Sequence, residues 1–153
     1  MVEFAGNGSQ IHGYLATPEG SGPGIVVIQE WWGLVEHIAD VCDRFAAEGF
    51  VALAPDLYAG KTTAEPDEAG KLLMAMELDE AGKAMGGAVD YLRGHDRVQP
   101  KKIGSVGFCM GGNLALLVAT LRPLDASVAF YPFPFAPVDV AKLSGPALAH
   151  IAE

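Results

Sequence analysis

The sequence predicts an α/β fold in which a mostly parallel sheet follows a leading antiparallel hairpin. Short apolar runs bounded by glycine and proline recur along the chain, as in strands that are buried on both faces of a parallel sheet. Segments with a helical period of apolar residues separate these runs, and this alternation implies right-handed crossovers. The length of 153 residues fits one domain, so we expect a single core over residues 1–153.

In the first half of the chain, turn residues and apolar runs delimit a hairpin, two further strands and one helix. The hairpin turn falls at Gly6-Asn7-Gly8-Ser9, a composition typical of tight turns. The helix has apolar side chains at a helical period and ends before Gly49, which suits a C-terminal cap. In chain order we expect these elements at residues 2–16, 24–29, 34–48 and 50–54.

The second half of the chain continues the alternation. Helix-forming residues interrupted by glycines indicate one or two helices over residues 61–92. A loop of proline and aromatic residues, 132–137, precedes the final strand. The remaining elements are expected to be a strand at residues 102–108, a helix at 113–121 and two strands at 126–130 and 146–151.

Composition excludes several classes of function. The net charge of −9 argues against nucleic acid and against an anionic membrane surface, because both bind through lysine and arginine. The apolar runs fall far short of the roughly 18 residues of a membrane span, and the N-terminus lacks a secretory signal. Cys42 and Cys109 therefore indicate free thiols in a cytoplasmic protein. No cluster has metal-ligand spacing, so we expect no metal.

The clearest local motif is Gly107-Phe108-Cys109-Met110-Gly111-Gly112, a G-x-C-x-G between a predicted strand and a predicted helix. In a nucleophile elbow the central residue lies on a strained strand-to-helix turn, and the glycines let the backbone pass closely. Cys109 would stand above the carboxyl edge of the sheet, with the N–H of Met110 pointing at a developing oxyanion. The alternatives are a small buried cysteine in a glycine-rich turn and a dinucleotide loop, whose G-x-G-x-x-G spacing is absent.

A second motif, Gln29-Glu30-Trp31-Trp32-Gly33, follows the first parallel strand. Its carboxylate, Glu30, is expected at the same sheet edge as Cys109, and the N–H of Trp31 comes from the loop that supplies a second oxyanion donor. The alternatives are a charge at the N-terminus of the next helix for Glu30 and plain packing for the tryptophans.

These segments, together with APDLYAG and the closing PALAHIAE, resemble the dienelactone hydrolase family over nearly the whole chain. The resemblance implies an α/β-hydrolase-like fold and cofactor-free hydrolysis of enol-lactones and related esters, which are small-molecule substrates. The family uses a Cys-His-Asp triad. By the resemblance Cys109 is the nucleophile, Glu30 is the carboxylate that contacts the thiol, and the N–H groups of Trp31 and Met110 form the oxyanion hole.

The sequence departs from the family pattern at its C-terminal end. The triad aspartate and histidine of the family match no position up to Glu153, so we expect a truncated domain that lacks the last strand and helix. The four histidines are expected to be surface or packing residues, and ester hydrolysis is expected to be barely above background. An exposed edge of the last strand then favours self-association. The family's substrate-anchoring Arg, Tyr and Trp have no match in residues 61–80, so the substrate stays open.

The state of the thiol follows from two opposing effects. A helix N-terminus favours the thiolate of Cys109 by roughly 0.3–2 kcal/mol, whereas a Glu30 carboxylate about 4 Å away disfavours it by roughly 4 kcal/mol. We therefore expect a neutral thiol. Two other functions remain open: a non-catalytic binding or assembly module with the same fold, and a redox-active thiol protein.

Overall fold

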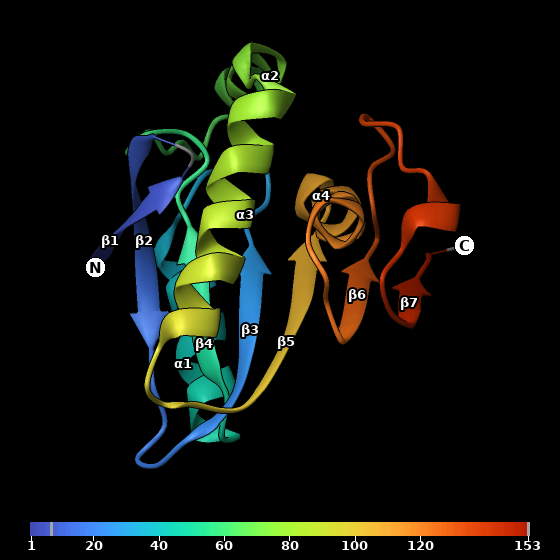
Figure 1. Cartoon of the computed structure of the whole chain (residues 1–153). Helices are drawn as coiled ribbons and strands as arrows, with labels where there is room; N and C mark the ends of the chain where they lie inside the picture. The colour runs from blue at the N-terminus through green and yellow to red at the C-terminus, as the bar shows by residue number, and fades with distance from the viewer. Residues whose placement is uncertain (7, 153) are drawn as a thin grey trace.

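The computed structural model describes residues 1–6 and 8–152 and shows a seven-stranded sheet with helices on both faces (Figure 1). The strands are β1 Val2–Gly6, β2 Ser9–Ala16, β3 Gly22–Ile28, β4 Val51–Pro55, β5 Val98–Phe108, β6 Ala126–Phe130 and β7 Ala147–His150. The helices are α1 Glu36–Ala47, α2 Pro66–Ala75, α3 Leu78–Gly94, α4 Met110–Leu121 and a short 3-10 helix at Val140–Lys142.

The strand order in the sheet is β1-β2-β4-β3-β5-β6-β7. β2 pairs with β1 and with β4 in antiparallel fashion, whereas the pairs from β4 to β7 are all parallel. The predicted mostly parallel sheet with a leading hairpin is confirmed, although Asn7 of the predicted turn lies outside the described residues. Because β3, β5 and β6 are parallel, the residues that follow them meet at one edge of the sheet.

The helices divide between the two faces of the sheet according to the direction in which the chain moves (Figure 1). α1 connects β3 to β4 and packs against β2, β3 and β4. α3 lies in the connection from β4 to β5, and α4 connects β5 to β6. Both connections run across the sheet in the direction opposite to that from β3 to β4, and the two helices pack together on the other face. Right-handed crossovers in opposite directions place their helices on opposite faces, so the strand order accounts for both layers.

Two apolar clusters fill the space between the sheet and the helices. The larger cluster includes the fully buried Ile28, Met85 and Leu114 and involves α3 and α4. The smaller cluster involves α1 and includes the fully buried Ile38 and Cys42. Full burial of one large aliphatic side chain contributes about 1.5–3 kcal/mol. Because Cys42 is fully buried in the smaller cluster, it is a packing residue of α1.

Several element boundaries differ from prediction, and for two of them the structure shows the cause. α4 begins at Met110 instead of residue 113, because the turn at Cys109 leads directly into the helix and its first turn accommodates Gly111 and Gly112. β5 begins at Val98 instead of residue 102, because Val98 pairs with Gly22 of β3. In both places contacts with a neighbouring element override local propensity. Residues 61–92 hold two helices, α2 and α3, as one of the two predicted options.

The face of the sheet beside α1 is partly open. A groove of about 460 Å³ there is lined by residues of β3, β5 and β6 and by Phe45 and Phe50. The four residues of β7 are exposed, and Leu148 is 55% exposed. Self-association through this edge stays a prediction. No helix among the described residues combines the length and the apolar character that a bilayer crossing requires.

Candidate active site

Cys109 stands between β5 and α4 in a backbone conformation that is rare for a residue with a side chain. Its φ is 57° and its ψ is −120°, and the first helical residue follows it directly. A positive φ at a non-glycine residue costs of order 1–3 kcal/mol and is usually associated with function. The strained strand-to-helix turn that the G-x-C-x-G spacing predicts is therefore present at Cys109.

The glycines of the motif are required by close backbone approach. A methyl group on Gly107 would overlap the carbonyl oxygen of Gly111, and one on Gly111 would overlap the carbonyl oxygens of Ile28 and Gln29. The first turn of α4 thus lies directly against the end of β3. This contact places Cys109 and the residue after Gln29 at the same sheet edge.

Hydrogen bonds from the neighbouring strand and loop hold the turn in place. The N–H of Cys109 donates to the carbonyl oxygen of Phe130 at 3.1 Å, and its own carbonyl oxygen accepts from the N–H groups of Gly112 and Phe133, both at 3.0 Å. The side-chain amide of Asn113 donates to the carbonyl of Ala136 and accepts from its N–H. The predicted proline-aromatic loop is therefore hydrogen-bonded to the turn at Cys109 and to the first turn of α4.

Glu30 directly follows Gln29, whose carbonyl oxygen lies against the first turn of α4. It is half-buried, and its carboxylate Oε1 accepts a hydrogen bond of 2.9 Å from the hydroxyl of Tyr131. Its negative charge raises the pKa of Cys109, so the carboxylate lies within electrostatic reach of the sulfur. The structure thus brings the two predicted groups together and adds a third, Tyr131.

Three effects act on the pKa of the Cys109 thiol. Burial raises it most, a hydrogen bond from the Met110 backbone lowers it, and the Glu30 charge raises it. The net direction is upward, so the predicted neutral thiol is confirmed in direction. The predicted main cause, the Glu30 carboxylate, was wrong, because burial of the thiol away from water raises its pKa more than the carboxylate does.

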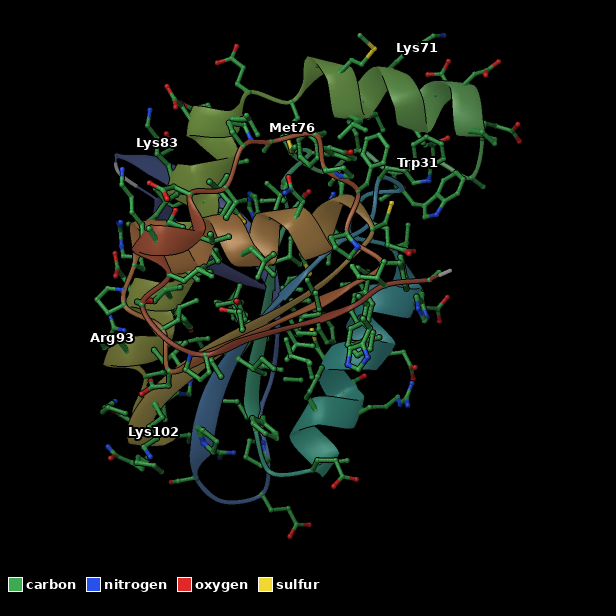
Figure 2. All side chains as sticks on the ribbon, turned by 90° about the vertical axis from the view of Figure 1, so that its right-hand side faces the viewer. Trp31, Lys71, Met76, Lys83, Arg93 and Lys102 are labelled. Carbon is green, nitrogen blue, oxygen red and sulfur yellow. The ribbon has the colours of Figure 1, made fainter. Side chains whose placement is uncertain are left out.

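The two predicted oxyanion donors follow two neighbouring parallel strands, β3 and β5. Met110 is the first residue of α4, and its N–H acts on the sulfur of Cys109. Trp31 is half-buried, packs on the larger apolar cluster and meets Trp32 edge to face, with ring centroids 5.1 Å apart. Figure 2 shows Trp31 at the same end of the molecule as Lys71 and Met76, and far from Lys102 of β5.

Sequence reasoning missed the role of two tyrosines. Tyr58 lies in the APDLYAG segment, where it is buried and its hydroxyl donates to the sulfur of Met110 at 3.3 Å. Burial and the charge of Cys109 raise its pKa to about 12. Tyr131 was not singled out, although an aromatic residue directly after a parallel strand is the signal that would have found it.

Other candidate side chains have partners of their own. His150 stacks on Phe130 with centroids 4.6 Å apart, and His12 is an exposed partner of Glu3 at 3.5 Å. Cys42 is fully buried, and burial raises its pKa to about 12, which does not suit a resolving cysteine. Within residues 1–6 and 8–152, no group of three or more potential metal ligands occurs.

Comparison with known proteins identifies the family. The family model described as "Dienelactone hydrolase family" matches residues 11–153. The chain belongs to the dienelactone hydrolase family. Its curated relatives include "Protein usf" of Aquifex pyrophilus, which is 48% identical over 142 residues. The "Putative carboxymethylenebutenolidase" of Aquifex aeolicus is 44% identical over 142 residues.

The solved structures support the same fold. The structure named "m3DLH" matches with a TM-score of 0.82 at 29% identity, and covers 97% of this chain and 65% of that chain. The two Aquifex relatives are matched over 88% of this chain, which spans 62% of the length of each of them. The resemblance inferred from the sequence motifs and the α/β-hydrolase-like fold are thus confirmed.

Proposed function

We propose that this dienelactone hydrolase family chain hydrolyses carboxylic esters and lactones, with Cys109 as the nucleophile. The observation that carries the proposal is the cysteine at φ 57°, whose thiol is acted on both by a helix N-terminal N–H and by a carboxylate. Membership of a family named for lactone hydrolysis supports the substrate class. The name of the Aquifex aeolicus relative points in the same direction.

In the proposed reaction, the thiolate of Cys109 attacks the carbonyl carbon of the ester. The carbonyl oxygen becomes an oxyanion, which the N–H groups of Trp31 and Met110 hold. Among the described residues the N–H of Trp31 donates to no acceptor, which supports this role. The carbon–oxygen bond to the alcohol then breaks, the alkoxide takes from water the proton that the thiol released to it, and a thioester remains on Cys109. Water attacks the thioester, releases the acid and returns the thiol.

The proposed attack requires that the thiol of Cys109 first lose its proton. The four histidines of the chain lie on β2, in α1, at the end of α3 and on β7. We propose that none of them serves as the base, so the neutral thiol is rarely converted to thiolate. The acyl transfer to Cys109 is therefore expected to be slow, and the turnover is expected to stay barely above background.

The test is to trap the acyl group on the sulfur. Incubation with p-nitrophenyl acetate should place an acetyl group on the peptide that contains Cys109, as read by mass spectrometry. Cys109→Ala should lose the label, while Cys42→Ala, which removes the buried cysteine, should keep it. Acetylation elsewhere only, or ester turnover that survives in Cys109→Ala, would contradict the proposal.

A further inference from the structure

A hydrogen bond joins the ends of two strands that are not neighbours in the sheet. Tyr131 follows β6, Glu30 follows β3 by one residue, and the tyrosine hydroxyl donates to the carboxylate Oε1 at 2.9 Å. β5 lies between β3 and β6 in the strand order, and Cys109 directly follows β5. Two strand spacings separate β3 from β6, about 9–10 Å. The Tyr131–Glu30 bond therefore spans the strand end that carries the nucleophile.

The backbone and the ring of Tyr131 are both fixed. Its φ is 37°, a left-handed conformation that turns the chain at once after β6. Its N–H donates to the carbonyl oxygen of His150 at 2.8 Å, and its ring contacts Phe108 with centroids 6.3 Å apart. The phenol is thus held at the sheet edge from two sides, although the residue is 49% exposed.

The charges around the sulfur act on one another. Glu30, Tyr58 and Tyr131 are the titratable groups that interact with Cys109, and each comes from a different strand end. Burial and the bond to Glu30 raise the pKa of Tyr131 to about 12, with a smaller contribution from the charge of Cys109. The phenol therefore stays a neutral donor through the pH range in which a thiol titrates.

We propose that Tyr131 is a positioning residue that holds the Glu30 carboxylate in place and weakens the repulsion that a Cys109 thiolate meets. Without the hydroxyl, the carboxylate is free to turn and accept a hydrogen bond from the thiol, which keeps the sulfur protonated. The inference deepens the proposed function, because it rests on Cys109 as the nucleophile. Its test needs no substrate, so a failure of ester hydrolysis does not affect it.

The test compares the pH dependence of Cys109 alkylation by iodoacetamide, read on its peptide by mass spectrometry. Tyr131→Phe should move the midpoint of the profile upward by about one pH unit. In a Glu30→Gln background the same substitution should move it little, because the group through which Tyr131 acts is gone. Tyr14→Phe is the matched control, since Tyr14 donates to Asp43 at the same 2.9 Å in a bond that involves neither Glu30 nor Cys109.

The outcomes separate positioning from a structural role. An unchanged midpoint in Tyr131→Phe overturns the proposal, and so does an equal shift in the Glu30→Gln background, which would mean that Tyr131 acts on the sulfur directly. A second measurement leaves Tyr131 intact and so does not depend on the fold of its variant. NMR titration of the Tyr131 ring carbon should show a phenol pKa below about 12 in Glu30→Gln. An unchanged value there also overturns the proposal.

Discussion

Gly111 in the first turn of α4 lies directly against the carbonyl oxygen of Gln29 at the end of β3. The contact leaves no space for a side chain on Gly111. Because Gln29 immediately precedes Glu30, it also sets how closely the helix that follows Cys109 approaches the carboxylate. The geometry of the candidate site is therefore fixed by backbone packing, and the first prediction tests this packing.

Gly111→Ala should destabilise the protein by about 3 kcal/mol or more, because its methyl group overlaps two carbonyl oxygens of rigid backbone. The measurement is the free energy of unfolding from urea denaturation. Gly70→Ala is the matched control: it lies in α2 with nothing within 4 Å, and should stabilise the chain by about 0.5–1 kcal/mol. Equal stability of Gly111→Ala and the wild type would show that the first turn of α4 yields easily.

Glu30→Gln should lower the pKa of Cys109. The negative charge disfavours the thiolate, so its removal brings the midpoint of alkylation down and increases the rate near neutral pH. The decrease should be partial, because burial is the larger cause and remains. Glu36→Gln, an exposed change in the first turn of α1, should leave the midpoint where it is. A rise in Glu30→Gln would mean that the carboxylate assists ionisation.

The stability of the fold should fall in alkaline solution through Cys42. Burial raises its pKa from 9.0 to about 12, so the folded state binds the proton more tightly than the unfolded state. The corresponding stabilisation is fully present below pH 9.0 and is lost as the pH rises towards 12; its size is roughly 4 kcal/mol. Cys42→Ala should show a shallower loss of unfolding free energy over this range. Identical slopes in both proteins would contradict the burial of this thiol.

Asn113→Ala should loosen the loop that borders Cys109. The amide makes two hydrogen bonds with the backbone of Ala136, and its removal leaves both backbone groups without a partner. We expect a loss of about 1–3 kcal/mol and faster proteolysis within residues 132–137. Asn113→Asp keeps the acceptor but not the donor, so its loss of stability and its rate of proteolysis should lie between those of the wild type and Asn113→Ala. Unchanged proteolysis in Asn113→Ala would show that the loop is held by other contacts.

The sheet edge at β7 should support association of copies of the chain. Leu148 is 55% exposed on a strand whose only described partner is β6, and the charge of −9 opposes contact between copies. Light scattering should therefore show more association as salt screens this charge. Leu148→Lys, which places a charge on the edge, should reduce association. A stable monomer at all salt concentrations would contradict this prediction.

The sequence predicted those parts of the site that depend on local pattern. The spacing around Cys109 located the strained turn, because strand, glycine and helix signals are adjacent in the chain. Tyr131 was missed because it meets Glu30 across 101 residues, and only the strand order brings the two together. The direction of the thiol pKa followed from charge alone, but the dominant cause required knowledge of burial, which no single motif gives.

The order of the strands has a practical consequence for engineering. Three different strands, β3, β5 and β6, end next to Glu30, Cys109 and Tyr131. Each of these strands is held in the sheet by its own backbone hydrogen bonds. A library at position 131 also changes how Glu30 acts on the sulfur, because in our proposal Tyr131 acts through that carboxylate. The reactivity of the thiol can thus be varied by substitutions at the strand ends, while the backbone pairing of the strands stays in place.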